Sequence, residues 1–284
     1  MKILILGGSG MLGHKLWMNL QQRYETWVTV RGTSGQFPDR PEFPRKYVRS
    51  HVDGLIFDEV TRSLASIQPD LVINCIGLIK QLPLAEDPLS ALALNAMLPH
   101  RVSLLCRAAN IRMIHISTDC VFSGRKGNYL ESDQSDAEDL YGRSKFLGEV
   151  AYPHTVTLRT SIIGRELCSR YGLIEWFLAQ SANIKGYRRA IYSGFTTDEL
   201  SRIIADYVIP NRELSGVYHL SSDPISKYDL LCLARSIFGR KLEILPDDQF
   251  FCDRSLNSTR FRQKTKYNPP SWQVMIEEMA AKPV

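Results

Sequence analysis

The stretch DLYGRSKFLGE, residues 139–149, places the phenol of Tyr141 four residues before the ammonium of Lys145. In a helix, residues four apart lie on one face, so these two side chains would be neighbours. A free tyrosine titrates at about 10, and a nearby positive charge favours its phenolate form. Such a pair could deliver a proton in a reaction near neutral pH. The same spacing also fits an ordinary surface pair, so its meaning depends on the elements that precede it.

A glycine-rich segment near the N-terminus directly follows an apolar run. It reads ILILGGSGMLGHKL over residues 3–16. Glycines between a strand and a helix are typical of a dinucleotide-binding turn, because they let backbone amides approach a pyrophosphate at the helix N-terminus. The sequence therefore predicts a dinucleotide site that includes Gly7, Gly10, Met11, Leu12 and Gly13.

Arg31 follows the second apolar run, at the position where NAD-specific sites usually carry an acidic residue. A guanidinium can bind a 2′-phosphate through two parallel hydrogen bonds but offers little to a bare hydroxyl. The sequence thus favours NADP(H) as the cofactor, with NAD(H) as the alternative. Asp53, after the third run, could accept a hydrogen bond from the adenine amino group. The small turn of Cys75, Ile76 and Gly77 after the fourth run would let the cofactor lie across the sheet edge.

Short apolar runs alternate with helical patterns through the first 160 residues. Strands separated by helices predict βαβ units and a parallel sheet that is covered on both faces, and right-handed crossovers make it doubly wound. We therefore expect an α/β protein with a Rossmann-type, doubly wound parallel sheet and a smaller C-terminal α/β lobe for the substrate. Strands are expected at 2–7, 26–31, 47–53, 70–77, 112–118 and 154–160, and helices at 11–23, 58–67, 89–109 and 141–151.

The alternation loosens after residue 160, where a second part of the chain begins. We predict a dinucleotide-binding domain over 1–161, to which parts of 191–222 return, and a mainly substrate-binding lobe over 162–284. Such a lobe would cover the carboxyl edge of the sheet, where ligands of these folds bind. Its helices are expected at 172–180, 195–209 and 226–239, and a strand at 216–222.

The composition favours a globular enzyme over a nucleic-acid-binding or membrane protein. The 284 residues carry a formal net charge of +5 without a basic block, and the six cysteines show no C-x-x-C pair. We expect reduced thiols and no metal site. No apolar run approaches the roughly 20 residues that span a bilayer, and the N-terminal run is too short for a signal peptide. We therefore expect a cytoplasmic protein that binds small polyanionic ligands, and neither nucleic acid nor a membrane.

The fifth apolar run, MIHISTDCVFSG, brings Ser117, Thr118 and Asp119 to the edge where the glycine turn lies. The chain now has a nucleotide turn, a strand-end hydroxyl and a Tyr–Lys helix, in that order. It resembles the extended short-chain dehydrogenases/reductases, and within them the dTDP-4-dehydrorhamnose reductase family. The resemblance covers nearly the whole chain. The motifs that carry it are GGSGMLG, NCIG, LNAMLPHRV, STDCVFSG, YGRSK and LRTSIIG, with GFTTDELSRI and DRSLNSTRFR as looser matches.

The resemblance implies roles for individual residues. Tyr141 would be the general acid, Lys145 its activator and a ligand of the cofactor ribose, and Thr118 the hydroxyl that orients the keto oxygen. Ser117 would lie beside the cofactor. Asn95 matches an asparagine near the cofactor or an active-site water, although a buried asparagine could equally be a structural hydrogen-bonding device.

Four further residues are candidates for the substrate side of the site: Lys80, Asp119, Cys120 and Arg254. Cys120 stands where many family members carry an aromatic residue. We expect it to pack rather than to react, because a hydride-transfer site needs no thiolate. Lys80 and Arg254 could bind a diphosphate or be solvated, and the adjacent pair Arg188/Arg189 is a weaker candidate for the same role.

The sequence therefore predicts an NADPH-dependent reductase of a 4-keto-6-deoxy nucleotide sugar, linked to dTDP, UDP or GDP, in surface-polysaccharide precursor synthesis. A first alternative is a nucleotide-sugar epimerase or dehydratase that recycles a bound NAD. A second is a non-catalytic, NADP-binding regulatory subunit. The oligomeric state stays open, with a homodimer as one alternative.

Overall fold

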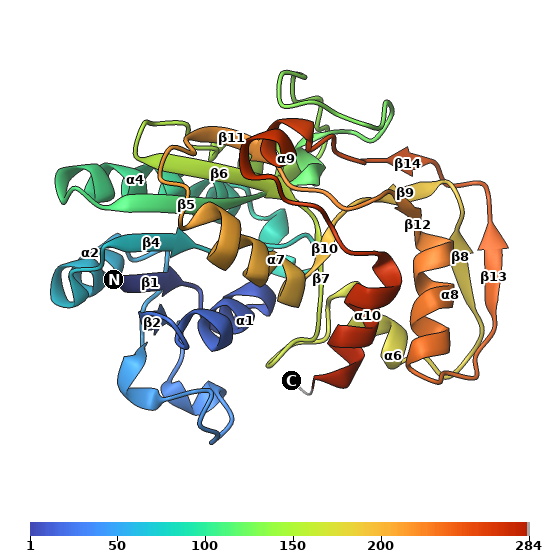
Figure 1. Ribbon diagram of the computed structural model, residues 1–284, viewed down its shortest axis with the longest axis horizontal. Helices are drawn as coiled ribbons and strands as arrows, with labels where there is room; N and C mark the ends of the chain where they lie inside the picture. The colour runs from blue at the N-terminus through green and yellow to red at the C-terminus, as the bar shows by residue number, and fades with distance from the viewer. Residues whose placement is uncertain (283–284) are drawn as a thin grey trace.

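The computed structural model describes residues 1–282 and contains a seven-stranded sheet whose strands all run parallel (Figure 1). The strand order is β11-β6-β5-β4-β1-β2-β3. The predicted α/β class and the doubly wound parallel sheet are confirmed. The strands are β1 (Lys2–Leu6), β2 (Glu25–Thr29), β3 (Val48–Arg49), β4 (Leu71–Asn74), β5 (Arg112–Thr118), β6 (Thr155–Thr160) and β11 (Gly216–His219).

Alternate side chains of the central strands enter two separate cores. On β1, Ile3 and Ile5 pack into the core under helices α1 (Met11–Leu20) and α7 (Thr197–Ile203), whereas Leu4 and Leu6 pack on the other face. The second core lies under helices α2 (Phe57–Ile67) and α4 (Leu98–Ala108). Because both faces are covered, β1, β4 and β6 are nearly continuous buried runs.

The strand order reverses between β1 and β4, which are hydrogen-bonded neighbours in the middle of the sheet. Leu6 at the end of β1 pairs with Asn74 at the end of β4. The crevice outside such a reversal is where open α/β sheets bind ligands. The glycine turn after β1 and the turn after β4 therefore meet at the expected place.

The rest of the chain forms the smaller body on the right of Figure 1, except that β11 returns to the main sheet and α7 packs on α1. Its strands are β7 (Ile162–Ile163), β8 (Ile184–Tyr187), β9 (Ala190–Tyr192), β10 (Phe195–Thr196), β12 (Ile225–Ser226), β13 (Ile244–Asp247) and β14 (Cys252–Asp253). Its helices are α6 (Leu173–Leu178), α8 (Lys227–Ile237) and α10 (Trp272–Ala281), whereas α9 (Thr259–Thr265) packs on β11 of the main sheet. Ser226, the first residue of the helix expected at 226–239, caps α8 by accepting from the Asp229 amide.

Several predicted elements differ from the observed ones. The helix expected at 195–209 is divided into β10, α7 and a π-helical segment (Ile204–Val208). The strand expected at 47–53 is only Val48–Arg49, because His51 turns the chain with a φ of 59°. The helix expected at 89–109 is divided into α3 (Pro88–Ala91), a π-helical segment (Leu92–Met97) and α4. The helix expected at 141–151 is α5 (Leu140–Leu147), which ends at Gly148.

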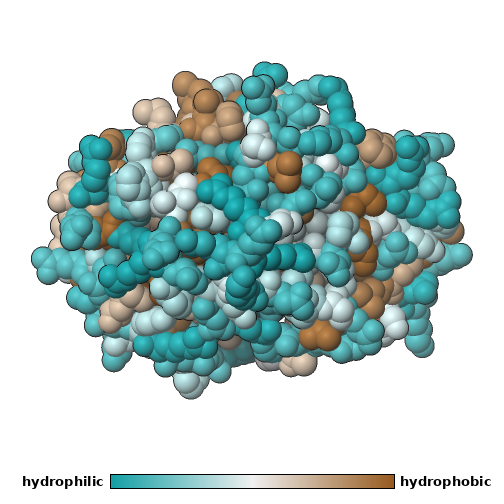
Figure 2. All heavy atoms as spheres, turned by 45° about the horizontal axis from the view of Figure 1, so that its top comes forward, coloured by the Kyte–Doolittle hydropathy of each residue, from teal (hydrophilic) through white to brown (hydrophobic). Residues whose placement is uncertain are grey.

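The continuous helical stretch Pro88–Ala108 is long and apolar enough, by length and composition, to cross a membrane. This corrects the expectation that no run approaches that length. Half of its most apolar window is buried inside the protein, and Val102 and Cys106 of α4 pack into the second core. A core helix of a globular protein meets the same criteria. Figure 2 shows a face of the molecule on which hydrophilic side chains predominate and apolar ones form small groups.

Candidate active site

The glycine turn joins β1 to α1 through contacts that exclude larger side chains. Gly7 has a φ of +86°, which side-chain-bearing residues rarely adopt. A Cβ on Gly13 would lie 2.1 Å from the Gly7 carbonyl oxygen, so strand and helix touch there through backbone alone. Gly10 is the N-cap of α1 and has no side chain to cap the helix. The amides of the first turn of α1 are thus arranged to bind an anion.

Arg31 and Asp53 follow the second and third strands, and the end of β2 is hydrogen-bonded to the glycine turn. The Gly7 amide donates to the Thr29 hydroxyl over 3.1 Å, and the Gly8 amide donates to the Thr29 carbonyl over 2.8 Å. Arg31 is two residues further along and exposed. Asp53 is half-buried, and its carboxylate accepts from the Leu55 amide over 2.9 Å. The Asp53 carboxylate therefore also has a local structural role.

Asn95 anchors the turn after β4. Its side-chain oxygen accepts from the Leu78 amide over 2.8 Å, and its nitrogen donates to the Leu78 carbonyl and to the Ser144 hydroxyl, each over 3.2 Å. A Cβ on Gly77 would lie 3.3 Å from the Asn95 oxygen and 3.7 Å from the Lys145 nitrogen. The asparagine thus fixes the position of the turn against the helix that carries Tyr141 and Lys145. It lies in the π-helical segment, a feature that often marks functional sites.

Tyr141 and Thr118 meet at the carboxyl edge of the sheet. Asp139 caps α5 by accepting from the Gly142 amide over 2.7 Å, which fixes Tyr141 in the first turn. Burial raises the pKa of Tyr141, and nearby Cys120 raises it further, while a hydrogen bond between the Tyr141 and Thr118 hydroxyls opposes the rise. The sequence led us to expect that Lys145 lowers this pKa. The structure shows the opposite direction, because burial disfavours the phenolate.

Lys145 follows Tyr141 in α5 by four residues, with only 5% of its surface exposed. Its ammonium donates to the Ile116 carbonyl on β5 over 2.8 Å. Burial lowers the pKa of Lys145 to about 8, against the opposing influence of Glu149 and Cys75. The lysine is therefore close to its titration point under ordinary conditions.

Lys145 should make the stability of the protein depend on pH. The folded-state pKa of about 8 lies below the ordinary lysine value of 10.5, so the unfolded chain binds more protons between these values. The contribution of Lys145 to stability should therefore rise with pH across that window, by up to about 3 kcal/mol. Lys145→Met should remove this rise and be more stable than wild type at pH 7. Urea unfolding from pH 7 to 10.5 checks this, with the exposed Lys241→Met as control. An unchanged slope in Lys145→Met would contradict it.

The candidate substrate residues gather around Tyr141. The Arg254 guanidinium donates to the Phe122 carbonyl over 2.8 Å and lies 3.6 Å from the Cys120 sulfur. Asp119 is buried and accepts from the Thr118 hydroxyl over 3.1 Å; burial raises the pKa of Asp119, and Arg254 opposes this. Burial also raises the pKa of the Cys120 thiol to about 12, as expected for an unreactive cysteine.

Lys80 forms an ion pair of 2.6 Å with Asp139, and its nitrogen lies 5.4 Å from the centre of the Tyr141 ring. It is therefore part of the same cluster. In contrast, the Arg188/Arg189 pair lies on the outer lobe, where Arg188 is paired with Asp248 and Arg189 covers the Phe251 ring. The structure gives this pair partners of its own and no contact with the Tyr141 cluster.

With this geometry established, comparison with known proteins decides the family. A family model described as the RmlD substrate binding domain matches residues 1–283. The chain belongs to this family. The resemblance carried by the sequence motifs is thereby confirmed.

Individual members of the RmlD substrate-binding domain family match over most of the chain. The dTDP-4-dehydrorhamnose reductase of Aggregatibacter actinomycetemcomitans is 26% identical over 99% of this chain and 98% of its own. Methionine adenosyltransferase 2 subunit beta of Danio rerio is 24% identical over 84% of this chain and 74% of its own. The crystal structure of dTDP-4-dehydrorhamnose reductase from Bacillus anthracis str. Ames in complex with NADP has a TM-score of 0.80 at 21% identity, covering 98% of each chain. That likeness shows the fold.

The RmlD-family site also contains charged residues that sequence reasoning missed. Glu149 and Arg159 form a buried ion pair of 2.7 Å beneath Lys145, and Ser117 donates its hydroxyl to Glu149 over 2.7 Å. Ser117, expected beside the cofactor, thus uses its side chain inside the protein. A signal was available in the motifs YGRSKFLGE, which ends at Glu149, and LRTSIIG, whose second residue is Arg159.

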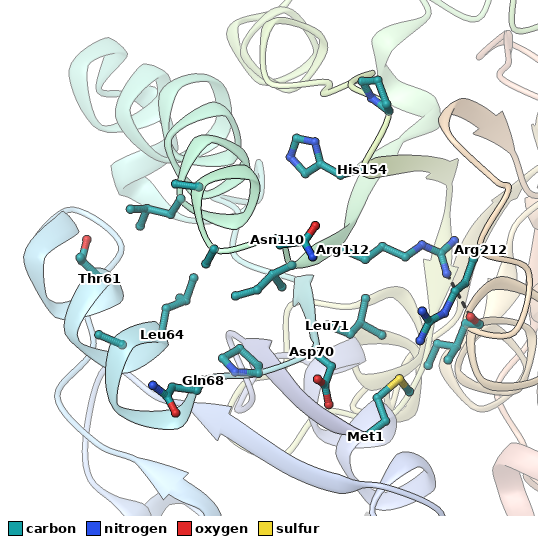
Figure 3. A pocket seen from close by; sticks show the side chains of 18 residues that line it. Met1, Thr61, Leu64, Gln68, Asp70, Leu71, Asn110, Arg112, His154 and Arg212 are labelled. Atoms are coloured by element: carbon teal, nitrogen blue, oxygen red, sulfur yellow. Dashed lines mark hydrogen bonds between the residues drawn. The ribbon is translucent and has the colours of Figure 1, made fainter.

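A cavity of about 1030 Å³ opens at the opposite edge of the sheet, far from this cluster in the fold (Figure 3). Its wall includes Asp70, before β4, and Arg112, at the start of β5. The Arg112 guanidinium is occupied by backbone carbonyls, among them those of Val208 and Asn211, at 3.0 and 2.9 Å. None of the residues proposed for catalysis lines this cavity.

Proposed function

We propose that this chain is an NADPH-dependent reductase of a 4-keto-6-deoxy nucleotide sugar, acting in the synthesis of surface-polysaccharide precursors. The observation that carries the proposal is the cluster of Tyr141 and Thr118, with Lys145 bonded to the adjacent strand β5, at the sheet edge that also holds the glycine turn. Membership of the RmlD family and the similarity to dTDP-4-dehydrorhamnose reductases support it. The dTDP-, UDP- and GDP-linked sugars are the substrate class, and the proposed location is the cytoplasm.

The glycine turn fits a dinucleotide because its residues leave room for one. Gly10 is exposed, and a Cβ built there meets only the Gly7 carbonyl oxygen, at 3.4 Å. The amides of Met11, Leu12 and Gly13 would bind the pyrophosphate, and Arg31 the 2′-phosphate. A bound nicotinamide cofactor would supply the hydride. We further propose Asp53, the turn Cys75–Gly77, Ser117 and Lys145 as the residues lining the remainder of this site, with Asn95 holding the turn in place.

We propose Tyr141 as the residue that donates the proton. Because burial raises the pKa of Tyr141, its phenol keeps its proton at neutral pH. It can give that proton to the keto oxygen of the sugar while the keto carbon accepts the hydride, so that a ketone becomes an alcohol. The neighbouring Thr118 hydroxyl would hold the same oxygen, and the Lys145 ammonium would stabilise the phenolate that forms. A tyrosine that stays protonated suits reduction better than it suits the reverse oxidation.

The substrate diphosphate would meet the positive groups near Tyr141. Arg254 lies against the Cys120 sulfur and the Phe122 carbonyl, and Lys80 lies over the Tyr141 ring. Both are cations at the rim of the cluster, as recognition of a diphosphate requires. We propose Arg254 and Lys80 as its ligands, with Asp119 and Cys120 shaping the wall beside the sugar.

A screen of NADPH oxidation with purified protein and dTDP-, UDP- and GDP-4-keto sugars tests the function. We expect stoichiometric NADPH consumption with at least one sugar and none with Tyr141→Phe. NAD that stays bound through purification, together with sugar turnover without net NADPH consumption, would instead indicate an epimerase or dehydratase. No oxidation with any of these sugars would overturn the proposal.

Arg31 should determine the preference of the protein for NADPH over NADH. Arg31→Ala removes the guanidinium proposed for the 2′-phosphate, so the Kd for NADPH should rise about tenfold, as expected for loss of a charge-assisted hydrogen bond. The Kd for NADH should stay unchanged. Fluorescence titration with both cofactors measures this, and Arg212→Ala, exposed at the opposite cavity, is the matched control. An equal loss of affinity for both cofactors would contradict the assignment.

The relative methionine adenosyltransferase 2 subunit beta supports a second candidate, a non-catalytic NADP-binding subunit of another enzyme. In that case Tyr141→Phe would leave the cellular function intact. Complementation of a strain lacking this protein by wild type and by Tyr141→Phe separates the two candidates. Failure of Tyr141→Phe to restore the surface polysaccharide would support the reductase.

A further inference from the structure

Glu149 forms a closed set of hydrogen bonds beneath the candidate site. It follows the C-terminal end of α5, and 5% of its side chain is exposed. One carboxylate oxygen accepts from the Ser117 hydroxyl over 2.7 Å and from the Arg159 Nε over 2.8 Å. The other accepts from the Arg159 Nη2 over 2.7 Å. This single side chain therefore ties α5 to β5 and to β6.

Arg159 is held in turn by β11 and by an aromatic ring. Its Nη1 donates to the Nε2 of His219 over 3.2 Å, and its guanidinium lies 5.2 Å from the centre of the Phe122 ring. The His219 Nδ1 donates to the Tyr129 carbonyl over 3.0 Å. Burial lowers the pKa of His219 to about 3, so this histidine is neutral and accepts the guanidinium proton. The network is thus fully hydrogen-bonded and has one negative and one positive charge.

Lys145 precedes Glu149 by four residues, and the negative charge of Glu149 acts on its ammonium. Its ammonium is fixed on the carbonyl of Ile116, and the next residue, Ser117, is held by Glu149. Of the charged groups around Lys145, Glu149 opposes the lowering of the Lys145 pKa most strongly. The Glu149 carboxylate therefore acts on Lys145 in two ways. It holds the part of β5 to which the ammonium is bonded, and its negative charge favours the protonated lysine.

The other titratable groups that face Lys145 are neutral. Cys75 of β4 also favours the charged lysine when ionised, but burial raises the pKa of Cys75 to about 12. His115 of β5 is fully buried, and burial lowers its pKa well below the ordinary value. At neutral pH the charge that Lys145 faces is therefore that of Glu149, which Arg159 partly offsets.

We propose that Glu149 is a positioning residue of the candidate site: its carboxylate fixes α5 against β5 and β6 and provides the negative charge that keeps Lys145 protonated. Arg159 has the opposing role, because it neutralises part of that charge. This inference rests on the same site as the proposed reductase function, and it concerns a residue that does not touch the reacting atoms.

If the Glu149–Arg159 ion pair had only a structural role, a different result would be expected. Loss of either partner of a buried pair leaves an uncompensated charge or unpaired donors, so both losses should destabilise the protein in the same way. An electrostatic role predicts effects of opposite sign. Removing the Glu149 charge should favour neutral Lys145, whereas removing the Arg159 charge should favour its ammonium form.

The test follows the titration of Lys145 itself, without cofactor or substrate. Protein labelled with ¹³C at the lysine Cε is titrated by NMR, and the Lys145 signal is assigned by its loss in Lys145→Met. Glu149→Gln should lower the Lys145 pKa by about one unit or more, and Arg159→Gln should raise it. The stability of each variant is measured in parallel by urea unfolding.

The double variant Glu149→Gln/Arg159→Gln removes both charges. It is used for the titration where a single variant fails to fold, because a neutral replacement of a buried ion pair is often tolerated. It should lower the Lys145 pKa as Glu149→Gln does. A Lys145 titration that is unchanged, or that moves in the same direction in both single variants, would overturn the proposal. Since the readout needs no keto sugar, a failed NADPH-oxidation screen would leave this result intact.

Discussion

Tyr141→Phe should lower kcat for the reduction of the keto sugar by about 10²–10⁴-fold. The phenol is the proposed proton donor beside Thr118, and phenylalanine keeps its ring without the hydroxyl. A loss of this size corresponds to about 3–5 kcal/mol of transition-state stabilisation. The Kd for NADPH should stay close to wild type, because the glycine turn and Arg31 are untouched. Steady-state kinetics and fluorescence titration measure the two quantities.

The matched control for this substitution is Tyr187→Phe, which removes a hydroxyl from an exposed tyrosine on β8. It should retain wild-type kcat. Thr118→Ser should keep most of the activity and Thr118→Val should lose it, because the hydroxyl rather than the methyl group contacts Tyr141. A Tyr141→Phe enzyme with near-normal kcat would remove the phenol from the mechanism and leave the family assignment untouched.

The parts of the fold that depend on local patterns could be predicted from the sequence. The alternation of apolar strands and amphipathic helices gave the parallel sheet, and the glycines between the first strand and helix gave the turn at the strand reversal. The third strand was overestimated because the left-handed backbone of His51 has no signal in the apolar pattern. The π-helical segment around Asn95 was missed because the hydrogen-bond partners of Asn95, Leu78 and Ser144, lie elsewhere in the chain.

The sequence predicted side chains that the structure brings together at this edge of the sheet, but it did not predict their electrostatics. Helical spacing correctly placed Tyr141 and Lys145 on one face of α5, yet spacing says nothing about solvent. Burial dominates both groups: it raises the pKa of Tyr141 and lowers that of Lys145. The Lys145 ammonium also bonds to a strand carbonyl, a partner that only the tertiary structure supplies. The roles therefore follow from the combination of sequence motif and burial.

The two glycines at the start of α1 should respond differently to alanine. In Gly13→Ala the new Cβ would lie 2.1 Å from the Gly7 carbonyl oxygen, so strand and helix must separate. Such overpacking costs about 1–3 kcal/mol or more, and the displaced turn should lose NADPH binding. In Gly10→Ala the nearest atom is 3.4 Å from the new Cβ, and the φ of −70° and ψ of 165° are open to alanine. Its Tm should therefore stay within a few degrees of wild type.

Gly10→Ala should nevertheless weaken NADPH binding at least tenfold, because the methyl group takes the space through which backbone amides approach the pyrophosphate. The pair of variants thus separates the two functions of glycine in this turn: close packing at Gly13 and access at Gly10. Thermal unfolding and NADPH titration of both variants provide the measurement. A Gly10→Ala protein with wild-type affinity for NADPH would show that no phosphate approaches this helix end, and the dinucleotide site would have to lie elsewhere.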